Sequence, residues 1–311
     1  MPAETLEVIV ARSAGTCFGV EAAIKMAERE KQPILGPLVH NPRIVDNLKS
    51  SGIPILERYS EVDTLAERGI KEVVITAHGY AKHVKEAMDR EGVKYHDATC
   101  PVLLRWVYTK IQRFEDQGFT VILVGNPKHA EIIASVSYGT HIHTVYSEAD
   151  VDALPEGLGP TVALCQTTIT REKFQHLVDY MRARKLPDLK AVDTRCKPVK
   201  NQQEAVESLA QWVDAMLIVG GFDSSNTTNL AKISSKYLPK ATYHVDSAAM
   251  VKPEWLHQVA HLGIGAGTST PKEQIEEVKQ RVVQLFPGRV LFRRDGDADT
   301  EPEDADVSRE I

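Results

Sequence analysis

Short apolar runs of strand length alternate along the chain with longer amphipathic stretches of helix length. The runs are rich in β-branched residues, and the clearest are Leu6–Val10, Val73–Thr76, Val121–Val124, Val162–Leu164 and Met216–Val219. Strands and helices that alternate in this way are typical of α/β proteins with largely parallel sheets. In such sheets ligands bind where a strand ends and the chain turns into the next helix, so we expect the functional residues there.

Three of the four cysteines lie in the same local setting. Cys17, Cys100 and Cys196 each follow an apolar run and a short polar turn, and each precedes a stretch with helical periodicity. The first two are 83 residues apart and the last two 96, about the length of a small α/β unit. An offset of 29 residues separates both Cys100 from His129 and Cys196 from Ser225. The pattern indicates an internal repeat.

Each repeat contains two more strand ends that carry small polar or imidazole side chains. They are His40-Asn41 and His78-Gly79, then His129–Glu131 and Gln166–Thr168, then Ser224–Asn226 and Gly265–Ser269. The repeats predict an α/β fold of three similar small domains with mainly parallel sheets, arranged with pseudo-threefold symmetry around a central cluster. The predicted domains are residues 1–97, 98–192 and 193–290, and an acidic disordered tail follows at 291–311.

Composition and charge narrow the possible partners. The chain has 311 residues, of which 42% are hydrophobic and 26% charged, as in ordinary globular proteins. The net charge is −6, but the segment 295–311 holds eight acids and one base, so the rest of the chain is nearly neutral. A near-neutral body argues against nucleic acid as a partner. The sequence shows no signal peptide and no apolar run of membrane length, so we expect a cytoplasmic protein without a membrane partner.

The cysteines carry the first candidate chemistry, because thiols stay reduced in the cytoplasm. Cys165 lies inside an apolar strand and is expected in the core. Cys17, Cys100 and Cys196, one from each domain, can converge on the axis and bind zinc or an iron–sulfur cluster. Structural zinc normally takes four protein ligands, often in C-x2-C pairs that are missing here. Three-cysteine ligation of a [4Fe–4S] cluster leaves one iron open to polarise a substrate.

The polar strand ends describe a ligand. Histidines, hydroxyls and amides beside exposed backbone N–H groups at helix starts suit an anion, especially a phosphate or diphosphate. The sequence has neither a Walker A loop nor a dinucleotide fingerprint. Glu131 is the one acid among these positions. It can deliver protons, or it can simply complement a helix dipole, and the sequence leaves both interpretations open.

An ordered set of motifs identifies a family. The motifs are Gly15–Val20 followed by Glu21, Val39–Asn41, Ala77–Gly79, Asp97–Pro101, Gln166–Thr168, Ser224–Asn226 and Ala266–Pro271. Over residues 8–285 they resemble the 4-hydroxy-3-methylbut-2-enyl diphosphate reductases, the last enzymes of the non-mevalonate isoprenoid pathway. The resemblance implies that Cys17, Cys100 and Cys196 hold a [4Fe–4S] cluster whose open iron binds the allylic hydroxyl of the substrate.

The resemblance also implies roles for the remaining residues. Thr167 and Glu131 would form a proton network at the substrate hydroxyl, with Glu131 as the proton donor. The implied reaction uses two electrons and two protons to remove water, giving isopentenyl and dimethylallyl diphosphates. The electrons would come from reduced ferredoxin or flavodoxin. The implied diphosphate ligands are His40, His78, His129, Ser224, Ser225, Asn226 and Ser269.

The sequence departs from the family pattern at three places. Thr16 stands where phenylalanine is common, Ala130 replaces the proline of a His-Pro-Glu run, and Gln202 replaces the arginine of an Asn-Arg-Gln run. Two other functions stay open. A quinolinate-synthase-like dehydratase would use the same open iron, but its carboxylate substrate would favour more arginine near the site. A non-catalytic metal or redox sensor would have no need of Glu131 or Thr167.

Overall fold

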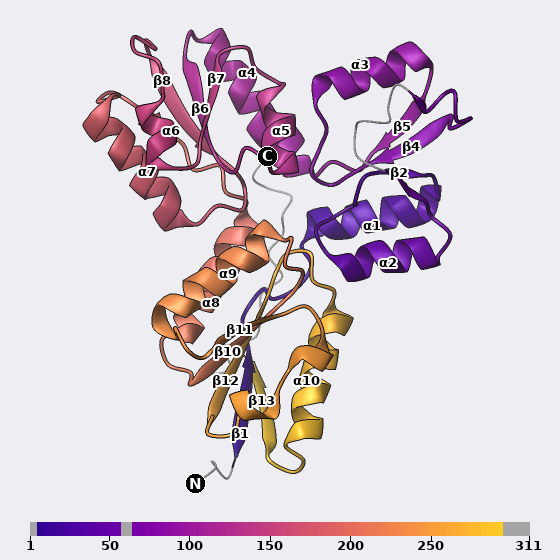
Figure 1. Ribbon diagram of the computed structural model, residues 1–311, viewed down its shortest axis with the longest axis vertical. Coiled ribbons are helices and arrows are strands. Elements are labelled where there is room, and N and C mark those ends of the chain that lie inside the picture. Colours follow the sequence, from indigo (N-terminus) through magenta and orange to yellow (C-terminus); the bar gives the residue numbers. More distant parts are fainter. Residues whose placement is uncertain (1–4, 57–63, 295–311) are drawn as a thin grey trace, which may run out of the picture.

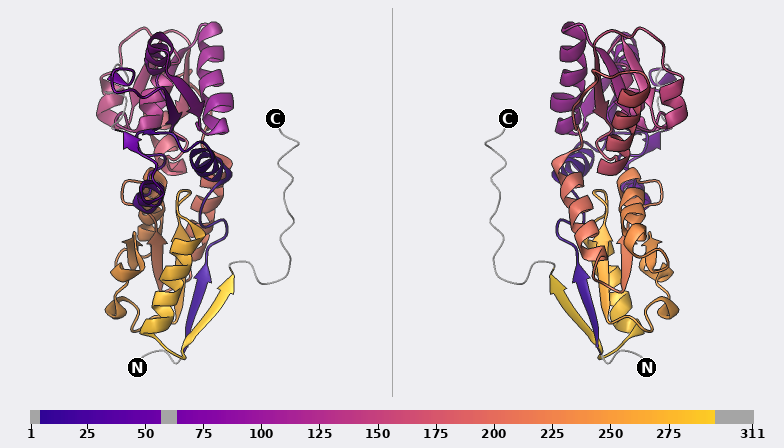
Figure 2. Two further views of the ribbon diagram at one scale, coloured as in Figure 1. Left: turned by 90° about the vertical axis from the view of Figure 1, so that its right-hand side faces the viewer. Right: turned by 90° about the vertical axis from the view of Figure 1, so that its left-hand side faces the viewer.

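The structure, a computed structural model, describes residues 5–56 and 64–294. In this part of the chain, helices flank three parallel sheets, and three lobes meet at the centre of the molecule (Figure 1). The molecule is thin when it is turned by 90° (Figure 2). These features confirm the predicted α/β class with three parallel sheets. Most of the predicted acidic tail, residues 295–311, lies outside the described residues.

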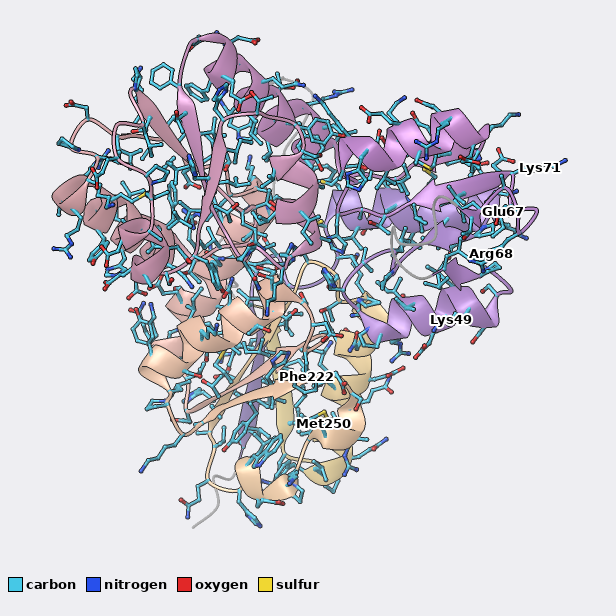
Figure 3. All side chains as sticks on the ribbon, turned by 45° about the horizontal axis from the view of Figure 1, so that its top comes forward. Lys49, Glu67, Arg68, Lys71, Phe222 and Met250 are labelled. Atoms are coloured by element: carbon cyan, nitrogen blue, oxygen red, sulfur yellow. The ribbon has the colours of Figure 1, made fainter. Side chains whose placement is uncertain are left out.

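The first sheet has the strand order β3-β2-β4-β5. Its strands are Ile34–Leu35 (β2), Ile55–Leu56 (β3), Glu72–Ile75 (β4) and Lys94–Asp97 (β5). Its helices are Phe18–Glu30 (α1), Pro42–Ser50 (α2) and Lys82–Glu91 (α3). Charged side chains gather at the outer end of this lobe, away from the centre, among them Lys49, Glu67, Arg68 and Lys71 (Figure 3).

The second sheet has the order β7-β6-β8-β9. Its strands are Thr120–Val124 (β6), Ile142–Val145 (β7), Thr161–Cys165 (β8) and Lys190–Ala191 (β9), and its helices are Thr109–Asp116 (α4), Ala130–Val136 (α5), Glu148–Asp152 (α6) and Arg171–Arg184 (α7). A helix follows Cys100, as the sequence predicts, but it is not a regular α-helix. Its segment Leu103–Tyr108 (η2) has π-helical hydrogen bonding. Such segments are frequent at functional sites.

The third sheet has the order β11-β10-β12-β1-β13. Its strands are Leu6–Val10 (β1), Ala215–Val219 (β10), Thr242–Val245 (β11), His261–Ala266 (β12) and Val290–Arg294 (β13). Its helices are Lys197–Ala210 (α8), Ser225–Tyr237 (α9) and Lys272–Leu285 (α10), with short 3-10 turns at Ala248–Met250 (η3) and Pro253–Trp255 (η4). Successive residues of β1 face opposite cores: Val8 packs with Val278 of α10, and Ile9 packs with Val206 of α8.

The strand β1 requires a correction to the predicted domains. We predicted residues 1–97 as one domain, but β1 pairs in parallel with β12 and β13 of the third sheet, with Val8 opposite both Leu262 and Phe292. Both faces of β1 are thereby buried against helices of that lobe. The predicted end at residue 290 is also too early, because β13 continues to Arg294.

One interior strand in each of the second and third sheets is buried along its whole length. Every residue of β8 and β10 is buried, as a parallel sheet covered on both faces requires. Cys165, the last residue of β8, has an exposed fraction of 0% and packs in an apolar cluster with Val124, Ile169 and Phe174. It is therefore a core residue, as predicted.

Candidate active site

Every predicted site residue lines one pocket where the three lobes meet. The side chains come from strand ends of all three sheets, because the parallel strands direct their carboxyl ends toward the centre (Figure 1). The pocket is also lined by apolar residues, of which Val20 and Val39 belong to the motifs, whereas Val102 and Val199 lie outside them. The predicted residues in it are Cys17, Cys100, Cys196, His40, His78, His129, Glu131, Thr167, Ser224, Ser225, Asn226 and Ser269.

Each cysteine is fixed to a neighbouring strand-end loop through its backbone. Cys17 and Cys196 are the N-cap residues of α1 and α8, and Cys100 directly precedes the helical segment that begins at Pro101. The backbone N–H of Cys17 donates to Thr268 O at 3.1 Å, that of Cys100 to Ala77 O at 3.0 Å, and that of Cys196 to Thr167 O at 3.3 Å. These three acceptors occupy equivalent positions in the repeats. The backbone geometry therefore repeats as the sequence does.

The three thiols are free and lie close together. A Cβ built on Gly19 would lie 2.7 Å from Cys100 Sγ and 3.9 Å from Cys17 Sγ, so both sulfurs border this glycine. Burial raises the pKa of all three thiols, that of Cys100 to about 11 and that of Cys196 to about 12. For Cys100 and Cys196, the neighbouring thiols raise the pKa further. Among the described residues, no three His, Cys, Asp or Glu side chains are arranged to hold a single metal ion.

Three imidazole rings stand together on one side of the pocket. The ring centroids of His40 and His78 are 4.1 Å apart. The ring centroid of His129 lies 5.2 Å from that of His40 and 5.8 Å from that of His78. His129 is also the N-cap of α5, where its Nδ1 accepts a hydrogen bond from the backbone N–H of Glu131 at 3.2 Å. His129 therefore directs its other ring nitrogen, Nε2, away from the helix end.

Glu131 is the buried acid of the site, with an exposed fraction of 3%. Its carboxylate accepts hydrogen bonds from Thr167, from the backbone N–H at 2.6 Å and from Oγ1 at 2.7 Å. Burial raises the pKa of Glu131 to about 7, although the two bonds from Thr167 oppose the shift. The carboxyl group can therefore hold or release a proton near neutral pH, which is what a general acid requires.

The start of α9 supplies hydroxyl and amide groups. Ser224 caps the helix by accepting a bond from the N–H of Thr227 at 3.2 Å, and Ser225 Oγ contacts Thr168 Oγ1 at 3.0 Å. Ser269, from the β12–α10 loop, donates its hydroxyl to His40 O at 3.1 Å. The third lobe thus joins the histidine side of the pocket. Hydroxyl and amide donors at a helix N-terminus form a suitable surface for an anion.

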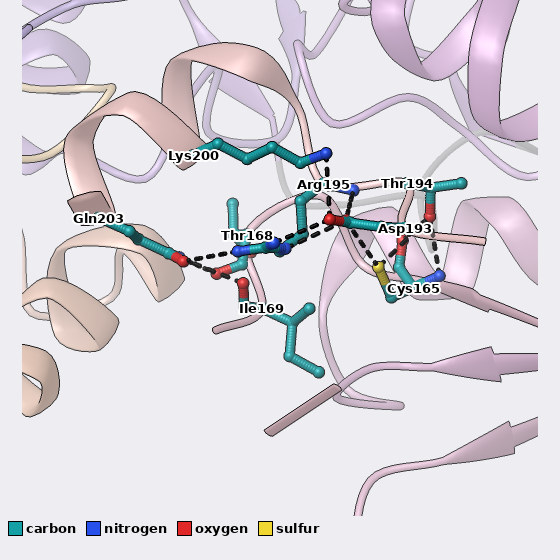
Figure 4. A network of polar contacts seen from close by, with 8 residues as sticks. All are labelled: Cys165, Thr168, Ile169, Asp193, Thr194, Arg195, Lys200 and Gln203. Atoms are coloured by element: carbon teal, nitrogen blue, oxygen red, sulfur yellow. Dashed lines mark hydrogen bonds and ion pairs between the residues drawn. The ribbon is translucent and has the colours of Figure 1, made fainter. Parts of the chain in front are cut away.

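A charged network supports the turn before Cys196 (Figure 4). Arg195 donates from Nε and Nη2 to the two carboxylate oxygens of Asp193, at 3.1 and 2.8 Å, and its Nη1 donates to Gln203 Oε1 at 3.2 Å. Lys200 Nζ lies 3.1 Å from the same carboxylate. Thr194 Oγ1 accepts the N–H of Cys165 at 2.8 Å. The turn that presents Cys196 is therefore held by the two bonds between Arg195 and Asp193 and by the bond between Cys165 and Thr194.

The sequence did not point to two polar residues of the site region as functional, namely Gln202 and Gln203. The two glutamines are buried, with exposed fractions of 2% and 4%, on the face of α8 that also carries Val199 and Val206. Two polar side chains on an otherwise apolar helical face are a signal that could have identified them, because a buried amide needs hydrogen-bond partners.

The fold and the site define a three-lobed α/β protein whose central pocket combines three thiols, a buried acid and a set of anion donors. The family model described as LytB protein matches residues 8–283. The chain therefore belongs to the LytB protein family. In the part of the chain that the structure describes, no helix has the length and apolar character needed to cross a membrane.

Named relatives and solved structures agree with this assignment. The 4-hydroxy-3-methylbut-2-enyl diphosphate reductase of Aquifex aeolicus is 34% identical over 92% of this chain and 99% of its own. That of Neorickettsia sennetsu is 32% identical over 91% and 93%. A solved structure of this reductase, described as the terminal enzyme of the non-mevalonate pathway, is 34% identical with a TM-score of 0.62, covering 90% of this chain and 99% of that one. The Plasmodium falciparum enzyme structure, 20% identical with a TM-score of 0.85 over 96% and 95%, shows the same fold.

Proposed function

We propose that this protein reduces (E)-4-hydroxy-3-methylbut-2-enyl diphosphate to isopentenyl and dimethylallyl diphosphates with a [4Fe–4S] cluster held by Cys17, Cys100 and Cys196. The observation that carries the proposal is that three free thiols, a buried acid and an anion-binding set line a single pocket. The curated relatives that bear this activity in their names support the substrate. A carboxylate-binding dehydratase would need cationic side chains, whereas the described residues that line the pocket include neither arginine nor lysine.

The three thiols suit a metal cluster. Each of these cysteines is partly buried and its thiol has a raised pKa, so without a cation the thiolates are disfavoured. A bound cationic metal centre reverses that preference, because a coordinating thiol is deprotonated outright. The cluster would supply electrons and one open iron that draws electron density from the substrate oxygen. Clusters of this kind need reduced thiols, so we place the protein in the cytoplasm.

The diphosphate would lie against donors from all three lobes. His40, His78 and His129 offer ring N–H groups, and the start of α9 offers the hydroxyls and amide of Ser224, Ser225 and Asn226. Ser269 completes the set from the loop between β12 and α10. Hydrogen bonds to a charged phosphate are short and about twice as strong as neutral ones. With such donors, a protein of net charge −6 would bind an anion through local hydrogen bonds and would need no basic surface.

Glu131 and Thr167 would move the proton. The Thr167 hydroxyl donates to Glu131 in the ionised form, and it can accept from Glu131 when the carboxyl is protonated. Thr167 lines the pocket, so its hydroxyl can pass the proton on to the substrate oxygen. The C–O bond then breaks, the oxygen leaves as water, and two electrons and a second proton complete the product. Reduced ferredoxin or flavodoxin would deliver the electrons.

Anaerobic purification tests the proposal directly. We expect about four irons and four sulfides per chain, as a [4Fe–4S] cluster requires, and turnover of the diphosphate substrate with a reduced viologen dye. A stoichiometric zinc with neither iron nor sulfide would refute the cluster and favour a metal sensor. Full iron loading without turnover of this substrate would retain the cluster and refute the assigned reaction.

A further inference from the structure

A buried glutamine joins the third lobe to the loop that leads into Cys17. Gln202 lies on α8, six residues after Cys196, and is 2% exposed. Its Nε2 donates to two backbone carbonyls, Ser13 O at 2.8 Å and Gly15 O at 2.9 Å. Its Oε1 accepts a hydrogen bond from Asn226 Nδ2 at 2.7 Å. Every hydrogen-bonding group of this amide therefore has a partner.

The two carbonyls determine which way round the Gln202 amide lies. A carbonyl oxygen can only accept, so the atom of Gln202 that faces Ser13 and Gly15 must be the nitrogen. The oxygen must then face Asn226, and Asn226 must present its own nitrogen in return. The orientation of the Asn226 amide is thus determined by two backbone groups that it never touches.

The loop that receives Gln202 has an unusual backbone. Ser13 has φ 62° and Gly15 has φ 108°, and a positive φ is uncommon for a residue other than glycine. This turn follows β1 and positions Cys17 at the start of α1. Two hydrogen bonds from a rigidly packed side chain compensate for such a conformation, so Gln202 stabilises the turn while it orients Asn226.

The hydrogen bond to Gln202 fixes the orientation of the Asn226 amide. It is 2% exposed and lines the central pocket, and its Oδ1 is buried without a hydrogen-bond partner among the described residues. One hydrogen of Nδ2 is taken by Gln202, which leaves the second as the donor available to an anion. Without the Gln202 oxygen, the amide could rotate and present its acceptor oxygen instead.

We infer that Gln202 is a positioning residue for the anion donor Asn226. The inference rests on the proposed function, because it assigns the diphosphate as the anion. Gln202 does not line the pocket, so its effect on binding must pass through Asn226. This predicts non-additivity: removing Gln202 weakens anion binding only while Asn226 is present to be misoriented.

A double-mutant cycle on the cluster-loaded protein tests the inference, with inorganic pyrophosphate as the probe and calorimetric Kd as the readout. We expect Gln202→Ala to raise Kd about tenfold, equivalent to about 1.4 kcal/mol. We expect the Gln202→Ala/Asn226→Ala variant to bind no more weakly than Asn226→Ala alone. Gln202→Met, which keeps the side-chain length, repeats the cycle if the alanine variant does not retain its iron.

The adjacent Gln203 provides a matched control. It is 4% exposed, donates to Thr168 O and Ile169 O, and accepts from Arg195, without a hydrogen bond to Asn226. Gln203→Ala should change the Kd for pyrophosphate independently of Asn226→Ala. The fold-changes of the two single variants should therefore multiply in the double variant.

Two results would overturn the role of Gln202. One is an unchanged Kd in Gln202→Ala, and the other is a double variant in which the fold-changes of Gln202→Ala and Asn226→Ala multiply. Failure of the wild-type protein to bind pyrophosphate would overturn it as well. Wild-type protein that binds pyrophosphate but does not reduce the substrate would refute the proposed function and leave the Gln202 test intact. KM and kcat separate the effects further, since a positioning role predicts a change mainly in KM.

Discussion

The Glu131 carboxylate and Thr167 are joined by two hydrogen bonds, from the threonine N–H at 2.6 Å and from its hydroxyl at 2.7 Å. Glu131 belongs to α5, which follows β6, and Thr167 follows the neighbouring strand β8. Adjacent parallel strands thus bring the two residues together at the same sheet edge. The two bonds therefore join the residues that we propose as the proton-transfer pair.

Replacing Glu131 with glutamine should separate catalysis from structure. The amide keeps the size of the carboxyl and can still accept one bond from Thr167, but it cannot supply a proton. We expect turnover with reduced viologen to fall by about 10²–10⁴-fold while iron content stays normal. The exposed Glu148, paired with His176, provides the control Glu148→Gln, which should retain full turnover. Near-normal turnover in Glu131→Gln would exclude Glu131 as the proton donor.

The raised pKa of Glu131 predicts how activity depends on pH. Its value of about 7 lies above the ordinary 4.5, so the acid form predominates below pH 7. Because the proton donor must be protonated, we expect kcat/KM to decrease as the pH rises through about 7. A profile that stays flat from pH 6 to 8.5 would contradict this assignment.

The same shift links Glu131 to stability. The folded protein holds the proton more tightly than the unfolded chain, so the contribution of Glu131 to stability is complete below pH 4.5 and is lost as the pH rises through 7. We expect Glu131→Gln to remove this part of the pH dependence. Urea unfolding of cluster-loaded protein between pH 5 and 8 measures it, and parallel curves for the two proteins would argue against a raised pKa.

Cysteine substitutions should distinguish the three proposed cluster ligands from Cys165, which lies in the core. Cys196→Ala removes a thiol from the pocket, and we expect loss of most of the iron and sulfide. Cys165→Ala is the matched control, because Cys165 is equally a free cysteine but lies in the apolar core. It should cost about 1 kcal/mol of stability and leave the metal content unchanged. Iron loss in Cys165→Ala, or its retention in Cys196→Ala, would contradict the ligand assignment.

Because Gly19 has no side chain, it leaves room for the sulfurs of Cys100 and Cys17. An alanine Cβ there would lie 2.7 Å from Cys100 Sγ, closer than such contacts allow. We expect Gly19→Ala to displace this thiol and lower the iron content, although alanine favours the helix. The exposed Ala22 on the same helix gives the opposite control: Ala22→Gly should cost about 0.5–1 kcal/mol of stability and leave the iron in place. Full iron in Gly19→Ala would show that the sulfurs need no such space.

The anion pocket is tested by removing donors from two elements at once. Asn226→Ala/Ser269→Ala deletes an amide on α9 and a hydroxyl after β12, and each bond to a charged group is worth about 1.5–3 kcal/mol. We expect Kd for pyrophosphate to rise at least about 100-fold. Ser234→Ala, which removes a buried hydroxyl on α9 bonded to Thr242, should leave the Kd unchanged. Unaltered affinity in the double variant would place the anion elsewhere.

The sequence predicted the site better than it predicted the limits of the lobes. The site residues follow strands, and a strand end is a local pattern, so His40, His129 and Ser225 could be located from their neighbours alone. The partner of a parallel strand is not local. Nothing near Leu6–Val10 indicates that its neighbours in the sheet begin at His261 and Val290. The strand was therefore assigned to the lobe that follows it in sequence.

Gln202 illustrates a second limit of sequence reasoning. Its position in the Asn201–Gln203 run was recognised as a departure from the family pattern, but the pattern assigns no contact to a side chain. The role of Gln202 depends on Ser13 and Asn226, which are 189 and 24 residues away along the chain. Only the packing of α8 against α9 and the loop after β1 brings these partners within hydrogen-bond distance.

The position of β1 between β12 and β13 has a consequence for biosynthesis. A ribosome produces β1 before the other described strands, yet the strands on either side of it, β12 and β13, are the last two of the described strands to be made. The first two sheets can form while synthesis continues, whereas the loop that carries Cys17 stays without its supports. The third sheet is therefore completed only after β12 and β13 have been synthesised, and we expect the turn that carries Cys17 to become fixed at that stage.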